Sequence, residues 1–134
     1  MGKIIKKILI ILLLFLITGC SRFNIVMSPT LYEVDDVILN VTTKWATKDG
    51  FIVKGTAINI GDETIPDPWY VETMFYSDST LTIPLGGSQE MMNFSLEPDV
   101  ESQWTLTYDN HYINESDYPH FELFNIKTFI QLED

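Results

Sequence analysis

The stretch F-I-V-K-G-T-A-I-N-I, from Phe51 to Ile60, decides the fold class. One set of alternate positions carries Phe, Val, Gly and Ala, and the other set carries Ile, Lys, Thr and Ile. A period of two residues is typical of a β-strand that buries one face. The stretch W-Y-V-E-T-M-F-Y, from Trp69 to Tyr76, alternates in the same way. Two strands separated by a proline-containing loop at 61–68 are therefore expected.

A turn signal precedes the first of these strands. Asp49-Gly50 lies between two β-prone runs, and glycine accepts the positive φ that a primed hairpin turn requires. The run on its N-terminal side extends from Leu31 to Trp45, and it predicts either one long strand or two strands with a bend. We therefore expect a hairpin that joins this run to the strand at 51–60.

The rest of the chain continues the β pattern. Further strands are expected at 81–83, 88–96, 103–108 and 120–132, turns at 77–80, 84–87 and 97–99, and a polar loop at 109–119. No helical stripe of ten or more residues with convincing caps interrupts them. The sequence thus predicts an all-β fold, a single antiparallel immunoglobulin-like β-sandwich of about seven strands over residues 31–134.

The first nineteen residues have the composition of a signal peptide. Lys3, Lys6 and Lys7 precede an apolar run from Ile8 to Ile17, which is about half the length that a membrane-spanning helix needs. Residues 1–19 are therefore expected to form a signal helix that is removed from the mature protein. Ile17-Thr18-Gly19-Cys20 resembles the lipobox of prokaryotic lipoproteins. That resemblance implies a diacylglyceryl group on Cys20, which would become the mature N-terminus.

The mature chain is strongly acidic. Residues 20–134 contain 5 basic and 19 acidic side chains, a net charge of −14, which argues against nucleic-acid binding and against electrostatic membrane docking. Two acyl chains suffice for stable anchoring, and residues 20–30 would serve as the tether. We expect a lipid-anchored protein on the extracytoplasmic face of the cell membrane or outer membrane.

Three segments carry a further resemblance. Gly55–Gly61, Val71–Asp78 and Ile83–Ser88, followed by Phe94, resemble the FxLYD-type immunoglobulin-like domains of prokaryotic envelope proteins. The resemblance implies a non-enzymatic binding or accessory module and no catalytic residues. The chain departs from that pattern in the Ile65–Pro68 loop and in the insertion at 108–119.

Candidate chemistry is sparse. The two histidines, His111 and His120, form no recognisable pattern with a nucleophile, and the single cysteine belongs to the lipobox. No enzyme activity and no cofactor are therefore predicted. The 109–117 loop concentrates possible metal ligands, namely Asp109, His111, Glu115 and Asp117. The loop departs from the EF-hand pattern. Its concentration of possible ligands nevertheless leaves an alternative interpretation, in which the protein is a metal- or small-ligand-binding sensor or enzyme.

Aromatic residues near loops suggest a protein-binding surface. Trp69 and Tyr70 follow the proline-containing loop, and Tyr112 and Tyr118 lie in the polar loop. Aromatic side chains on loops of a rigid sandwich suit recognition of an envelope protein partner, although Trp69 and half of the tyrosines fit the core equally well. Another alternative is a subunit of a surface assembly, in which the strand at 120–132 pairs with a neighbouring copy.

Overall fold

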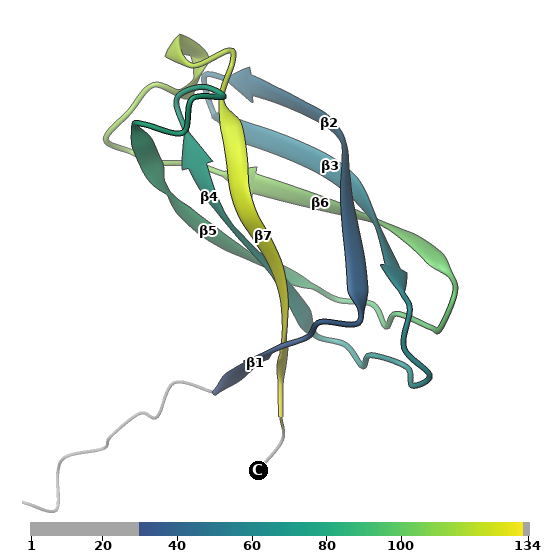
Figure 1. Ribbon diagram of the computed structural model, residues 1–134. Coiled ribbons are helices and arrows are strands. Elements are labelled where there is room, and N and C mark those ends of the chain that lie inside the picture. The colour runs from purple at the N-terminus through teal and green to yellow at the C-terminus, as the bar shows by residue number, and fades with distance from the viewer. Residues whose placement is uncertain (1–29, 133–134) are drawn as a thin grey trace, which may run out of the picture.

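Residues 30–132 are described by a computed structural model, and nearly all of its regular structure is β-strand (Figure 1). The strands are β1 (Leu31–Glu33), β2 (Val37–Thr47), β3 (Gly50–Asn59), β4 (Trp69–Tyr76), β5 (Pro84–Met92), β6 (Glu101–Tyr108) and β7 (Glu122–Gln131), with a 3-10 helix η1 at Glu115–Asp117. The predicted seven-stranded, all-β sandwich is confirmed. The predicted signal helix, Cys20 and most of the tether lie outside the described residues.

The strands form two antiparallel layers. One sheet has the order β1-β7-β4-β5 and the other the order β2-β3-β6. Neighbours along the chain pair in the hairpins β2–β3 and β4–β5, whereas β3–β6 and β4–β7 join segments that are distant in sequence. The first strand, β1, pairs with the last strand, β7, so the two ends of the described chain lie together (Figure 1).

The core lies between the two sheets. Phe51, Val53, Gly55 and Ala57 of β3 are buried, as their alternation predicts, and Trp69, Val71 and Phe75 of β4 face them from the other sheet. Near one end of the core, Phe51 stacks on Phe121 with ring centroids 4.1 Å apart and on Phe75 at 5.4 Å. Each of these large side chains removes about 150–250 Å² of surface from water.

The run from Leu31 to Trp45 is two strands, the second of the two alternatives that its sequence allows. β1 belongs to one sheet and β2 to the other, and the chain crosses between the layers at Val34–Asp36. The hairpin at Asp49-Gly50 is confirmed, but its turn is not primed. Lys48 and Asp49 have negative φ, and the positive φ of 142° falls on Gly50, the first residue of β3.

Two expectations around β5 are wrong. Residues 81–83 belong to a loop in which the Ser77 amide donates to the Ile83 carbonyl over 3.0 Å, and Leu81 has a positive φ of 55°. Pro84 to Gly87 begin β5 and do not form a turn. Gly86 is required there because its φ is 127° and the Tyr108 hydroxyl occupies the space that a side chain would fill.

Strand β7 lies between β4 and the three-residue strand β1, so the expectation of an exposed edge is wrong only for the C-terminal end of β7. It pairs with β4 from Glu122 to Ile130 and with β1 from Phe129 to Gln131. Asn125, at φ 59°, bulges where the β4–β7 register shifts, and the Lys44 ammonium donates to the Phe121 carbonyl over 2.9 Å. Bulges and lysines are devices that protect strand edges from pairing with other chains.

A candidate binding groove at one end of the sandwich

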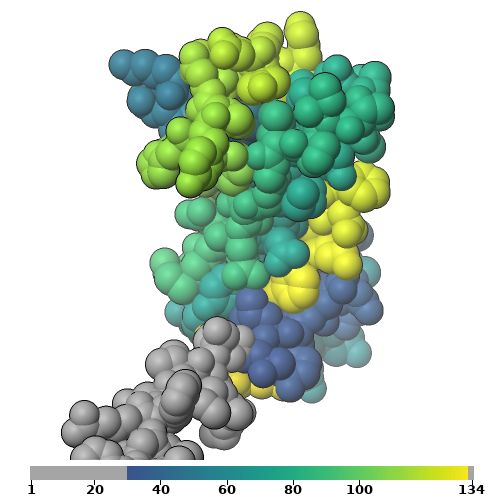
Figure 2. Space-filling view, turned by 90° about the vertical axis from the view of Figure 1, so that its left-hand side faces the viewer, coloured from purple at the N-terminus to yellow at the C-terminus, as the bar shows by residue number. Residues whose placement is uncertain are grey.

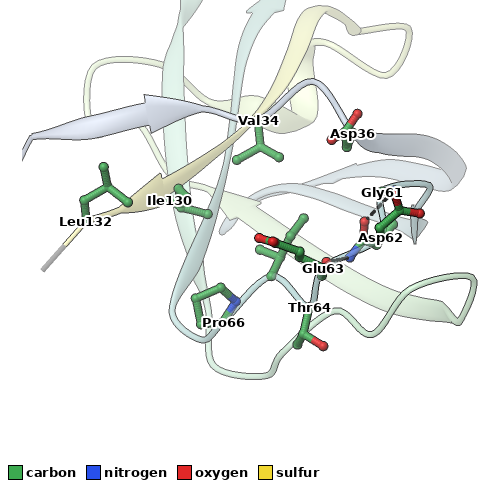
Figure 3. Close-up of a pocket in the computed structure, with 11 residues that line it drawn as sticks. Val34, Asp36, Gly61, Asp62, Glu63, Thr64, Pro66, Ile130 and Leu132 are labelled. Atoms are coloured by element: carbon green, nitrogen blue, oxygen red, sulfur yellow. Dashed lines mark hydrogen bonds between the residues drawn. The ribbon is translucent and has the colours of Figure 1, made fainter.

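A pocket of about 490 Å³ opens at the end of the sandwich where β1 meets the end of β7. Figure 3 shows Leu132, Ile130 and Val34 along one wall and Pro66, Thr64 and Glu63 along the other. Asp36, Gly61 and Asp62 lie at the pocket end remote from Leu132. The lining thus comes from three distant parts of the chain: the β1–β2 crossing, the loop after β3, and the end of β7.

Buried Asn59 shapes the loop wall of this pocket. Its Nδ2 donates to the Glu63 carbonyl over 2.7 Å and to the Leu96 carbonyl over 3.0 Å, and its Oδ1 accepts from the Gly61 amide at 2.9 Å. Ile65 exchanges two backbone hydrogen bonds with Leu96 at 2.9 and 3.0 Å. The loop is therefore fixed at both ends, and Glu63 lies between the fixed points.

A second pocket of about 390 Å³ adjoins the first. It is lined by Pro66, Asp67, Pro68, Ile130, Gln131 and Leu132, so the two pockets share Pro66, Ile130 and Leu132. We call the two together the end groove. We call its apolar lining residues the floor of the groove: Val34, Ile65, Pro66, Pro68, Ile130 and Leu132. Leu132 follows Gln131, which pairs with Leu31 at the start of β1.

Carboxylates surround this apolar floor. Asp36, Asp62 and Glu63 line the first pocket and Asp67 lines the second, and no Lys, Arg or His among residues 30–132 lines either one. The side chain of Glu63 extends into the space between the walls in Figure 3. Within residues 30–132 its carboxylate has no hydrogen-bond or ion-pair partner, and no three His, Cys, Asp or Glu side chains are placed to share a metal ion. The groove is therefore an apolar channel with a negative rim.

The predicted aromatic residues do not form one surface. Trp69 is fully buried and its Nε1 donates to the Phe94 carbonyl over 2.7 Å, so its ring belongs to the core. Tyr70 is half-buried at the start of β4, whereas Tyr112 and Tyr118 lie in the loop at the other end of the molecule (Figures 1 and 2). Tyr118 packs against the core, and only Tyr112 projects freely, with 96% of its surface exposed.

The 109–117 loop is held by its own hydrogen bonds. Glu115 is buried, and its Oε1 accepts from the Asn110 amide at 2.6 Å. The His111 side chain is largely exposed, with Nδ1 3.9 Å from Asp109 Oδ2, and Asp117 is exposed within η1. These four candidate metal ligands thus do not face a common point within the described loop.

Two carboxylates outside the groove have shifted pKa values. A hydrogen bond from Lys44 Nζ to Glu122 Oε1, 2.7 Å long, lowers the pKa of Glu122. Hydrogen bonds from the hydroxyl and amide of Thr80 lower the pKa of Asp78. Both groups serve local structure: Glu122 joins β7 to β2, and Asp78 closes the loop between β4 and β5.

Comparison with known proteins leaves the family open. Neither a family model nor a curated protein matches the sequence. Among solved structures, the Salmonella enterica trimeric lipoprotein SadB aligns with 97% of this chain and 77% of its own chain, at 10% identity and a TM-score of 0.44. An alignment at this level assigns neither a family nor a role. No helix in residues 30–132 has the length and apolar composition of a membrane span.

Local sequence patterns do not predict the end groove. Its walls come from residues 34–36, 59–68 and 130–132, which local patterns cannot bring together. The one local signal is the segment D-E-T-I-P-D-P, from Asp62 to Pro68, where carboxylates and rigid apolar residues are interleaved in a loop.

Proposed function

We propose that this protein is an exported lipoprotein, held at a membrane by acyl chains on Cys20, whose β-sandwich is a non-enzymatic binding module of the cell envelope. The lipobox-like sequence at Ile17–Cys20 supports the anchor. The observation that carries the binding role is the end groove, an apolar channel rimmed by carboxylates on a rigid scaffold. Such concave surfaces are the usual place for recognition in small domains.

The position of the groove is consistent with this role. The ten residues from Ser21 to Thr30 follow Cys20, and an extended chain of that length reaches about 35 Å. The groove lies at the end of the sandwich where β1 begins. A tethered module of this kind would hold the groove close to the bilayer surface, where it would meet other envelope proteins.

A photocrosslinking experiment in the native host tests this proposal. A photoreactive amino acid at Leu132, which is exposed on the groove wall, should give one discrete adduct on irradiation. The same residue at Ser79, in the exposed β4–β5 loop at the other end, serves as the control and should give none. Cys20→Ala should leave the precursor uncleaved and without acyl chains, which tests the anchor separately from the groove. Equal adducts from both positions, or none from Leu132, would contradict the binding role.

A further inference from the structure

We infer that the end groove binds an extended peptide segment of another envelope protein, one that places a Lys or Arg side chain beside apolar side chains. This inference deepens the proposed binding role by naming the chemistry of the partner. The statement that the peptide belongs to an envelope protein rests on the proposed function. The statement that the peptide carries a cation beside apolar side chains rests on the residues of the groove.

The charge of the rim selects a cation. Glu63 extends into the groove with no hydrogen-bond or ion-pair partner in the part of the chain that the structure describes, and Asp36, Asp62 and Asp67 add three more carboxylates without a lining cation. A carboxylate that loses water when a ligand covers it must gain a compensating partner. An ammonium or guanidinium group supplies that partner, whereas an anionic ligand would be repelled.

The floor selects apolar groups next to that cation. Val34, Ile65, Ile130 and Leu132 line the first pocket, and Pro66 and Pro68 extend the apolar surface into the second. A free metal ion or a simple polyamine would leave this surface in water. A ligand with both kinds of group covers the floor and neutralises the rim together.

The shape selects a chain. The two pockets follow one another along the wall formed by Ile130 and Leu132, which both pockets share. This wall is fixed by the pairing of β1 with β7, and the facing loop is fixed by Asn59 and by the Ile65–Leu96 bridge. A preformed groove of this kind spares the protein the cost of ordering itself when an extended segment binds.

The test is a fluorescence anisotropy titration of the full mature chain in detergent with short capped peptides. A peptide of alternating Leu and Lys residues should bind, and binding should weaken when salt rises from about 50 to about 200 mM. A Leu–Glu peptide and a Lys–Ser peptide, which lack the charge or the apolar groups, should each bind at least about tenfold more weakly.

Two matched double variants locate the binding. Asp62→Asn with Glu63→Gln removes two rim charges and should weaken the Leu–Lys peptide about fivefold to tenfold. Asp49→Asn with Asp109→Asn removes the same charge from exposed positions away from the groove and should change affinity less than twofold. Leu132→Ser, at a half-exposed position, tests the floor and should weaken binding several-fold without unfolding the protein.

Three results would overturn the inference. Equal losses in the two double variants would mean that the peptide responds only to the overall negative charge. Equal affinities for the Lys–Ser and Leu–Lys peptides would show that the apolar floor of the groove does not contribute to binding. Displacement of the Leu–Lys peptide by millimolar calcium at constant ionic strength, with the double variant Asp62→Asn and Glu63→Gln insensitive, would make the rim a metal site. None of these results bears on acylation of Cys20, so failure here is distinguishable from failure of the anchor.

Discussion

Asn59 is the residue on which the shape of the end groove depends most. It ends β3 and is fully buried, and it binds one carbonyl and one amide of the loop that follows it and the Leu96 carbonyl between β5 and β6. A strand pattern alone places Asn59 on the inward face, where an amide is unusual. The sequence therefore indicates that position 59 is special, but only the structure identifies the carbonyls that it binds.

Asn59→Ala should lower the free energy of unfolding by about 2–3 kcal/mol, because the Glu63 carbonyl and the Gly61 amide lose their partner and the Leu96 carbonyl keeps only the Ile65 amide. Urea unfolding followed by tryptophan fluorescence measures this change. Asn93→Ala, at an exposed asparagine between β5 and β6, should change stability by less than about 0.5 kcal/mol. Equal effects at the two positions would contradict the assigned role of Asn59.

The Lys44–Glu122 pair should make stability depend on pH. The pKa of Glu122 is lowered in the folded protein by its hydrogen bond from Lys44, so folding favours the ionised form. Its stabilising contribution is complete above the unfolded-state pKa of about 4.3 and is lost as the pH falls through the lowered folded value. Because the pair is partly exposed, Glu122→Gln should cost only about 0.5 kcal/mol at neutral pH.

The measurement is a pair of urea unfolding curves, for the parent and for Glu122→Gln, at neutral pH and near pH 3. The difference between the two proteins should be present at neutral pH and should shrink in acid. A difference that grows as the pH falls would have the wrong sign and would reject this interpretation of the pair.

Among the strands, β3 and β4 follow from local pattern, whereas β5 does not. The bounds of β4 are those that its sequence alternation predicts. Val71 and Phe75 face the core, and Glu72 and Met74 face outward. β5 begins with Pro84 and contains Gly86 and Gly87, which are turn residues in most contexts. In β5, the Tyr108 hydroxyl from the opposite sheet occupies the space that a side chain at position 86 would fill, so glycine is required there. Position 86 and Tyr108 are distant in sequence, so a local pattern cannot predict this contact.

Gly86→Ala should destabilise the fold by about 2–4 kcal/mol, because alanine at φ 127° is strained and its methyl group would displace the Tyr108 hydroxyl. Gly87→Ala is the matched control. Its new methyl group would meet the Met74 Sδ at 2.9 Å, near the end of a flexible side chain, and the Thr73 carbonyl oxygen at an ordinary contact distance of 3.5 Å, and no positive φ is involved. Thermal unfolding of both variants should show a much larger loss for Gly86→Ala, and a larger loss for Gly87→Ala would contradict the packing described for β5.

At the scale of the whole molecule, the layered all-β architecture could be predicted, but the pairing of distant strands could not. Period-two alternation identifies strands without naming their partners. It therefore gave no sign that β1 takes the place beside the C-terminal end of β7. The end groove depends on that pairing, because Ile130 and Leu132 form a wall only when the chain ends meet.

The charge of the whole molecule should oppose folding. Residues 20–134 carry a net charge of −14, and within residues 30–132 two lysines, Lys44 and Lys127, form ion pairs with carboxylates. Screening of carboxylate repulsion by salt should therefore raise the Tm by a few degrees between about 20 and about 300 mM NaCl. Differential scanning calorimetry measures this change, and a Tm that falls with added NaCl would show that attractive pairs outweigh the repulsion.

The proposed placement of this protein at a membrane depends on one covalent modification. Intact-mass spectrometry of protein purified from its native membranes tests it directly. We predict a chain that begins at Cys20 and carries the added mass of a diacylglyceryl group, with further acylation of the new N-terminus in some hosts. A mass that retains Met1 and shows no acyl adduct would contradict the proposed anchor.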